Sequence, residues 1–219
     1  MNVGADGWHP VGLSAGLAPG TSNGTRILGR EVVVWRDSTG VAHAWDDRCP
    51  HRGMRLSLGF VRGNEIACLY HGWRYDTAGR CRHIPAHPQL DPPETIRVPV
   101  HATTERLGMI FVRIREGPGP DLPEERPVTG VRSLAVDRGA DEAIAQAMHE
   151  PGAAVSALTP SLLLFWTGAE HILAGVQAVS AGRCMLHVVA VGEHGRDGQK
   201  RISTWSERLR AAIEAGAGA

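Results

Sequence analysis

Short apolar runs, separated by turn signals, follow one another along the first half of the chain. Residues 31–36 and 41–45 are joined by Asp37–Ser38–Thr39–Gly40, a polar turn that ends in glycine. Further strand candidates lie at residues 57–61, 65–69, 95–100 and 107–114, and turn signals such as Arg62–Gly63–Asn64 separate them. Several short strands at this spacing predict a small antiparallel sandwich or barrel over residues 1–116.

The pattern changes after residue 116. Residues 117–127 contain four prolines and three acidic residues, which predicts a linker. Residues 140–149 have helical composition with an acidic first turn, and three apolar stretches at 161–167, 171–180 and 184–191 predict strands of a second antiparallel sheet. Residues 203–214 predict a closing helix, because Trp205, Leu209 and Ile213 recur every fourth position.

These elements predict an α+β fold that is mostly β. An antiparallel sandwich or barrel occupies residues 1–116, and a small antiparallel sheet with two helices occupies residues 128–219. The segment 117–127 joins the two predicted domains.

Composition and charge narrow the classes of function. The chain has 219 residues with 23 basic and 23 acidic side chains, which argues against a nucleic-acid protein driven by phosphate neutralisation. The first dozen residues show no secretory signal, and the longest apolar run, residues 162–166, is far shorter than the roughly 18–20 residues that span a bilayer. We therefore expect a cytoplasmic protein without a membrane partner. Its four cysteines are then expected to be metal ligands or free thiols.

Two cysteines and two histidines form the most informative pattern. Cys49-x-His51 is followed, after sixteen intervening residues, by Cys68-x-x-His71. A zinc site built from local pairs more usually places two cysteines together and two histidines together. One thiolate and one imidazole from each segment suit a binuclear iron–sulfur centre, with both thiolates on one iron and both imidazoles on the other. A single zinc ion is the alternative.

The segments Cys49–Pro50–His51–Arg52–Gly53 and Cys68–Leu69–Tyr70–His71–Gly72–Trp73 resemble the Rieske [2Fe–2S] signature of the ring-hydroxylating oxygenase family. The likeness extends over about residues 8–114 and includes Trp8–His9–Pro10–Val11 and Tyr75–Asp76–Thr77–Ala78–Gly79. It implies one [2Fe–2S] cluster, held by Cys49 and Cys68 on one iron and by His51 and His71 on the other. Respiratory Rieske proteins carry an extra cysteine in each loop, where this chain has Met54 and Tyr70.

Full-length oxygenases of that family continue into a larger domain with a mononuclear iron held by an Asp-x₂-His-x₄₋₅-His segment and a distant carboxylate. No segment here matches, because Ile144 lies three residues after Asp141 and no histidine follows His149 at the required spacing. We therefore expect no mononuclear Fe(II), and a trimmed catalytic-like domain over residues 128–219. An unrelated small α+β domain is the alternative. We interpret the remaining candidate ligands as ordinary polar residues: His149, Glu150, Glu170, His171, His187, Glu193 and His194.

Seven arginines lie between Arg48 and Arg82 against two acidic residues, Glu65 and Asp76. They form either a basic rim that steers an acidic partner or an ordinary solvated surface. Cys81 and Cys184 are expected to be small buried hydrophobic residues. Trp73 is expected to pack beneath the second loop and shield the cluster.

The leading hypothesis is an electron-transfer component of an oxygenase system. It would take single electrons from a reductase or ferredoxin and pass them to a separate iron-bearing oxygenase subunit, in a homo- or hetero-oligomer. One alternative is a terminal oxygenase with an unrecognised iron site that performs aromatic hydroxylation or O- or N-demethylation. Another is a non-catalytic subunit that carries the cluster.

Overall fold

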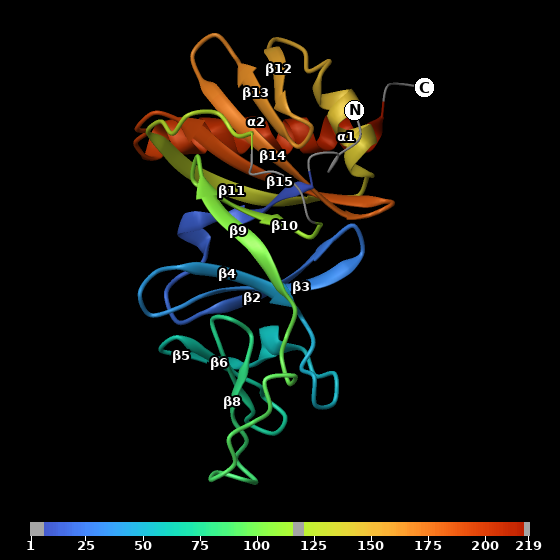
Figure 1. Ribbon diagram of the computed structural model, residues 1–219. Coiled ribbons are helices and arrows are strands. Elements are labelled where there is room, and N and C mark those ends of the chain that lie inside the picture. Colours follow the sequence, from blue (N-terminus) through green and yellow to red (C-terminus); the bar gives the residue numbers. More distant parts are fainter. Residues whose placement is uncertain (1–6, 116–120, 217–219) are drawn as a thin grey trace. The chain divides into compact units, whose positions relative to one another are not determined.

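The computed structural model describes residues 7–115 and 121–216 (Figure 1). Two helices, two 3₁₀ turns and short strands make up these ranges, and the elements follow in chain order: β1 Trp8–Leu13, η1 Ser14–Gly16, β2 Ser22–Ile27, β3 Arg30–Arg36, β4 Ala42–Asp46, η2 Leu56–Leu58, β5 Phe60–Arg62, β6 Glu65–Ala67, β7 Arg74–Asp76, β8 Cys81–His83, β9 Val100–Arg106, β10 Met109–Arg113, β11 Val128–Val136, α1 Ala140–Ala147, β12 Ala154–Thr159, β13 Leu162–Trp166, β14 His171–Ser180, β15 Arg183–Val191 and α2 Arg196–Ala215. The predicted fold class, mostly β with two helices, is confirmed.

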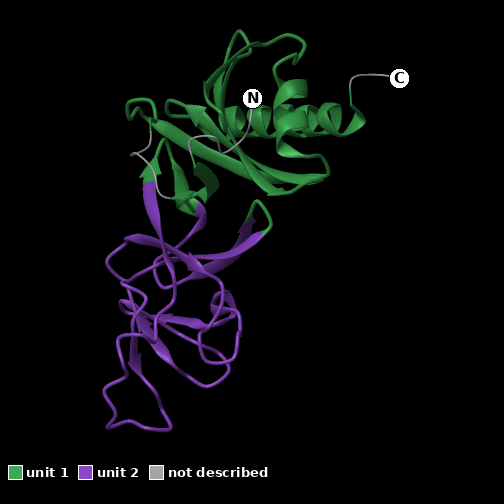
Figure 2. Ribbon diagram, turned by 45° about the vertical axis from the view of Figure 1, so that its right-hand side comes forward, with its two compact units in different colours: residues 1–15, 27–29, 105–219 green, residues 16–26, 30–104 purple. Residues whose placement is uncertain are grey.

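The chain divides into two compact units (Figure 2). Unit 2 comprises residues 16–26 and 30–104, and unit 1 comprises the described residues of 1–15, 27–29 and 105–219. The strands β1 and β10 pair with each other and belong to unit 1, although the predicted boundaries assign them to the first domain. The boundaries 1–116, 117–127 and 128–219 themselves stay a prediction.

Unit 1 is built on a five-stranded antiparallel sheet with the order β11-β15-β14-β13-β12. The predicted strands β13, β14 and β15 and the helix α1 are confirmed. The sequence pattern missed β11 and β12, because β11 interrupts its apolar residues with Gly130 and Arg132 at a bulge and β12 mixes apolar residues with serine and threonine. Helix α2 begins seven residues before the predicted start at residue 203.

Side chains alternate between the two faces of this sheet, as the pleat requires. One face, with Phe165, Leu186 and Val188, packs against α1 and α2 (Figure 1). The opposite face, with Leu173 and Val189, packs against β1 and β10. Unit 1 therefore has two hydrophobic cores, one on each face of a single sheet.

Part of the predicted linker is held against unit 1. Residues 117–120 lie outside the described residues, whereas Leu122 packs on the core beneath β10 and the Glu125 carboxylate accepts a hydrogen bond from the Leu107 backbone N–H at 3.1 Å. The described part of this segment is therefore attached to the turn between β9 and β10.

Unit 2 contains a four-stranded antiparallel sheet, β5-β6-β7-β8, and the β3–β4 hairpin, against which β9 pairs. Trp35, Trp45, Leu56, Ile66 and Tyr75 form the centre of its core, and each is fully buried. The loop after β4 and the loop after β6 each contribute a cysteine, Cys49 and Cys68, to this core.

Two predicted strands of this unit are wrong. Residues 57–61 form the end of η2 and the start of β5, because Asp47 binds both the backbone N–H and the hydroxyl of Ser57 and so bends the chain. Residues 95–100 are irregular before β9 begins at Val100, and their pairing is confined to an isolated bridge between Arg80 and Arg97. Tertiary contacts override the local apolar pattern at both places.

Candidate metal centre

The loop between β4 and η2 closes on itself at its two ends. The Cys49 N–H donates to the Met54 carbonyl at 2.8 Å, and the Gly53 N–H donates to the Cys49 carbonyl at 2.8 Å. Gly53 has a φ of +71°, a left-handed conformation that glycine adopts without a steric penalty. The tight turn leaves His51 at its tip.

The loop between β6 and β7 repeats this geometry. The Cys68 N–H donates to the Trp73 carbonyl at 2.9 Å, the Gly72 N–H donates to the Cys68 carbonyl at 3.0 Å, and Gly72 also has a φ of +71°. A β-carbon on Gly72 would lie 3.0 Å from Pro85, so the segment after β8 packs closely on this turn. Each of the two equivalent turns therefore has one cysteine at its base and one histidine near its tip.

The two cysteines lie together on the core side of the loops. Cys49 and Cys68 are each 3% exposed and belong to the core of unit 2. Burial raises the pKa of the Cys68 thiol, and the neighbouring Cys49 raises it further, while the backbone N–H groups of Tyr70 and His71 act in the opposite direction. Two adjacent thiolates in this position require a cation to offset their charge.

Tyr75 reaches the same site from β7. Its hydroxyl lies 3.1 Å from the Cys49 Sγ. Burial, and then the neighbouring Cys49, raise the pKa of the Tyr75 hydroxyl well above its usual value, so the hydroxyl keeps its proton and can donate to the sulfur. The sequence pattern did not predict this role of Tyr75, although its position just after the second loop is a signal that could have indicated it.

The two imidazoles lie together on the outer side. The His51 and His71 ring centroids are 4.6 Å apart; His71 is exposed and His51 is half-buried. The Trp73 indole stacks flat on His51 at 4.3 Å, so this residue of the second loop holds a histidine of the first. The Tyr70 ring lies 3.9 Å from that of His71. Burial lowers the pKa of His51, as do the neighbouring His71 and Arg52.

This arrangement fits a binuclear centre. The His51 Nδ1 atom is buried and has no hydrogen-bond partner, which leaves a lone pair available to a metal. Across the described ranges, no three His, Cys, Asp or Glu side chains converge on one point that a metal ion could fill. The structure places the four predicted residues in two pairs, the buried thiols of Cys49 and Cys68 and the outer imidazoles of His51 and His71, and two pairs of this kind suit two metal ions with different ligands.

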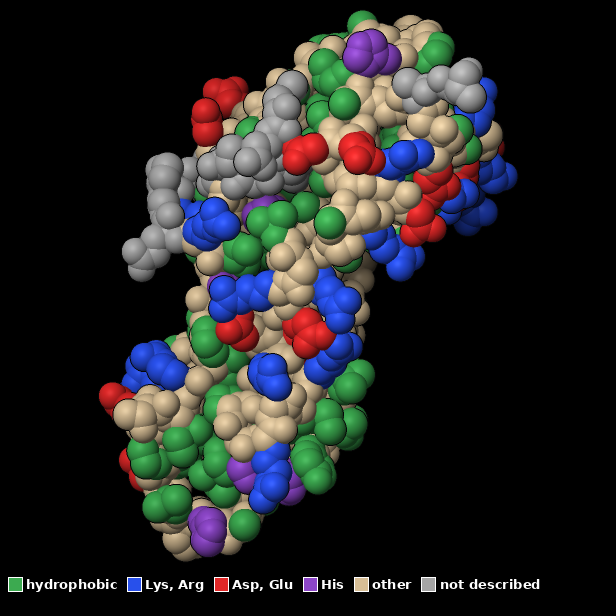
Figure 3. Space-filling model, turned by 90° about the vertical axis from the view of Figure 1, so that its right-hand side faces the viewer, with side chains coloured by type: hydrophobic (Ala, Val, Ile, Leu, Met, Phe, Trp, Pro, Cys, Tyr) green, Lys and Arg blue, Asp and Glu red, His purple; other side chains and the backbone are tan. Residues whose placement is uncertain are grey.

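Four of the seven arginines around this site are paired with carboxylates. Their ion pairs are Arg55–Glu31, Arg74–Glu65 at 3.2 Å, Arg80–Glu94 at 2.9 Å and Arg82–Asp76 at 3.9 Å. Figure 3 shows Lys and Arg side chains next to acidic ones on one face, with exposed hydrophobic side chains between them. Glu31 and Glu94 thus join Glu65 and Asp76, so four carboxylates stand against the seven arginines and a smaller positive excess remains.

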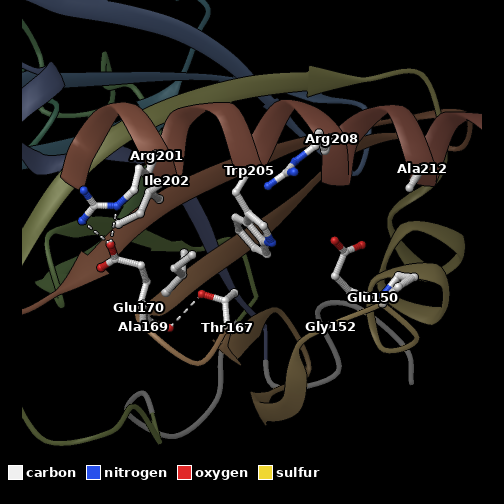
Figure 4. Close-up of a pocket in the computed structure, with 12 residues that line it drawn as sticks. Glu150, Gly152, Thr167, Ala169, Glu170, Arg201, Ile202, Trp205, Arg208 and Ala212 are labelled. Atoms are coloured by element: carbon white, nitrogen blue, oxygen red, sulfur yellow. Dashed lines mark hydrogen bonds and ion pairs between the residues drawn. The ribbon is translucent and has the colours of Figure 1, made fainter. Parts of the chain in front are cut away.

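The other candidate ligands of the second half have different partners. His187 is buried between Ser133 and Gln177, and burial lowers its pKa to about 4. Further contacts are Glu170 with Arg201 at 2.7 Å, Glu170 with His194 at 3.3 Å, His149 with the Ala145 carbonyl at 2.9 Å, and His171 with the Trp166 ring at 6.2 Å. Glu150 faces a cavity beside α2 (Figure 4).

Comparison with known families identifies the first half of the chain. A family model described as the Rieske [2Fe–2S] domain matches residues 7–101. This range contains all four residues of the candidate centre. In the described residues, no helix is long and apolar enough to cross a membrane.

Two curated relatives differ in how much of the chain they match. The oxidoreductase NdmD of Pseudomonas putida is 29% identical over 95% of this chain, and the match covers 40% of NdmD. A 4beta-methylsterol monooxygenase of Methylococcus capsulatus is 37% identical over 58% of this chain, and the match covers 34% of that protein. The chain thus spans less than half the length of these relatives.

A solved structure resembles both halves of the fold. Dicamba monooxygenase bound to dicamba superposes on 96% of this chain and 86% of its own, with a TM-score of 0.77 and 18% identity. At this identity the likeness shows the fold alone.

Proposed function

We propose that this chain, whose residues 7–101 match the Rieske [2Fe–2S] domain model, is an electron-transfer component of an oxygenase system. It would accept single electrons from a reductase or ferredoxin and deliver them to an iron-bearing oxygenase subunit. The observation that carries this proposal is the pairing of buried thiols and outer imidazoles around one site.

In this proposal Cys49 and Cys68 hold one iron, and His51 and His71 hold the other. When bound, a cluster of this type supplies a one-electron couple in a window of roughly −150 to +300 mV. The chain contributes the arrangement around it. Buried thiols keep one side away from water, and the exposed His71 gives a partner a short route to the other side.

The relatives that match this chain carry the names of an oxidoreductase and of a monooxygenase. The match to the oxidoreductase NdmD includes the second half of this chain, whereas the methylsterol monooxygenase matches over 58% of it. The exposed Leu69 and Tyr70 beside His71 suit a partner that makes apolar contacts next to the centre.

A terminal oxygenase is the second candidate. It is favoured by the likeness of the whole described fold, second half included, to dicamba monooxygenase. In that case the chain would itself hold a further iron.

Metal and sulfide analysis of anaerobically purified protein separates these candidates. Electron transfer predicts about two irons and about two acid-labile sulfides per chain, with a Rieske-type EPR signal after dithionite reduction. It also predicts reduction by a flavin reductase with NADH, without consumption of added aromatic substrate in air. About three irons per chain, with oxygen consumption coupled to substrate, would establish the oxygenase instead.

Replacing Tyr75 with phenylalanine is expected to lower the reduction potential by roughly 40 mV. The Tyr75 hydroxyl stabilises the sulfur of Cys49 more in the reduced, more negative state, and losing about 1 kcal/mol of that difference corresponds to this shift for one electron. A redox titration monitored by EPR measures it. Tyr70→Phe, at the other tyrosine of the chain, is the matched control and should leave the potential unchanged. Equal shifts in both variants would contradict the assigned hydrogen bond.

A further inference from the structure

The two loops of the candidate centre meet through an aromatic side chain. The backbone hydrogen bonds that close the turns at Cys49 and Cys68 each run within one loop. These bonds fix the shape of each turn, but they do not fix the imidazole of one loop against that of the other. The stack of Trp73 on His51 is a contact that crosses from the second loop to the first.

No hydrogen bond fixes the plane of the His51 ring in the described part of the chain. Its Nδ1 atom is buried without a hydrogen-bond partner, and no other described residue forms a hydrogen bond with the ring. Histidines that hold metal ions usually donate their second ring N–H to a carboxylate, a carbonyl or water, and this bond orients the ring. His51 therefore needs a different contact to hold its plane.

Trp73 supplies that contact. Its indole lies 4.3 Å from the His51 ring with 5° between the two planes, so the rings are stacked. The same side chain is partly buried and packs against the core of unit 2. A residue anchored in the core therefore supports the first-loop imidazole and covers one face of its ring.

The second imidazole has a different neighbour. The Tyr70 ring lies 3.9 Å from the His71 ring but is inclined to it by 34°, and Tyr70 is 58% exposed. Tyr70 directly precedes His71 in the chain, so this contact stays within the second loop. His51 thus has a flat support that is anchored in the core, whereas His71 has a tilted and exposed one.

We propose that Trp73 is the positioning residue of the first loop. Its indole holds the plane of the His51 ring and keeps water from one face of it, so that the two loops present their imidazoles in one fixed arrangement. This role rests on the ligand assignment of the proposed function and adds a residue outside the four ligands. The side chain can be changed alone, because the bond between the Cys68 N–H and the Trp73 carbonyl belongs to the backbone.

Modification of the full, cluster-free chain with diethylpyrocarbonate measures how well the stack protects His51. Cleavage after arginine places His51 in the peptide 49–52 and His71 in the peptide 63–74, so mass spectrometry follows each imidazole separately. Trp73→Leu should speed the modification of His51 by about fivefold, the factor that an aromatic pair contributes, and should leave the rate at His71 unchanged. Trp73→Phe keeps a ring that can stack, so its rate at His51 should stay within about twofold of that of the unmodified chain.

The cluster-loaded chain gives a second readout. Reduction adds a negative charge to the centre, and water that reaches the imidazole stabilises this charge. Trp73→Leu should therefore raise the reduction potential and change the EPR g values, and Trp73→Phe should restore both. A potentiometric titration followed by EPR measures the two effects.

Two control variants separate the stack from general packing. Ile96→Ala removes a partly buried side chain from the same core, and Tyr70→Leu removes the ring beside His71. Neither should speed the modification of His51.

The positioning role is overturned if Trp73→Leu leaves the rate at His51 unchanged or speeds both imidazoles equally. It is also overturned if Ile96→Ala acts as strongly, or if the loaded Trp73→Leu chain keeps the original potential. The modification needs no metal ion, so its result stays readable even if metal analysis contradicts the proposed cluster.

Discussion

Replacing His71 with cysteine is expected to retain a cluster but to lower its reduction potential by well over ~100 mV. The exchange puts a thiolate where a neutral imidazole stands in the outer pair, and the added negative charge stabilises the oxidised state. A potentiometric titration followed by EPR measures the shift toward the values of plant-type ferredoxins.

His87→Cys is the matched control for this variant. His87 is exposed and lies in the segment after β8, so a cysteine there adds a thiol without replacing a proposed ligand. The control should keep the original potential. An unchanged potential in His71→Cys, with the cluster present, would remove His71 from the ligand set.

Replacing Cys68 with alanine is expected to abolish the cluster. The variant loses one of the two buried thiols, and a single remaining cysteine on that side cannot complete the coordination of an iron. Iron and acid-labile sulfide should fall to background in purified protein, and the visible absorbance should disappear. Circular dichroism and gel filtration establish that the variant is folded.

Cys81→Ala provides a close comparison, because Cys81 is equally buried, lies in the same core, and has a pKa that burial raises. Its packing loss resembles that of Cys68→Ala, yet it should keep the iron and sulfide of the unmodified protein. If Cys81→Ala also loses both, or if Cys68→Ala keeps them, the ligand assignment is wrong. A stoichiometric zinc ion in place of iron would contradict the binuclear centre itself.

The sequence predicted those strands and helices whose own hydrophobic or charge pattern is strong and continuous. The β13, β14 and β15 strands are mostly apolar, and α1 has an acidic first turn. The sequence pattern gave a wrong prediction where side-chain contacts bend the chain, as at Ser57, which is hydrogen-bonded to Asp47. It missed strands that mix polar and apolar residues, such as β11. A local pattern cannot report a hydrogen bond from a residue ten positions away.

The sequence by itself predicted the two candidate metal-binding segments, and a family model described as the Rieske [2Fe–2S] domain matches the residues that contain them. Each segment is encoded locally, because its cysteine, histidine and glycine lie within five residues and one tight turn brings them together. Only the tertiary structure decided that the thiols face the core, that Trp73 stacks on His51, and that four of the seven arginines pair with carboxylates. The sequence also gave no sign that Glu150 and Trp205 line the same cavity, because they are 55 positions apart and only the packing of α2 on the sheet brings them to it.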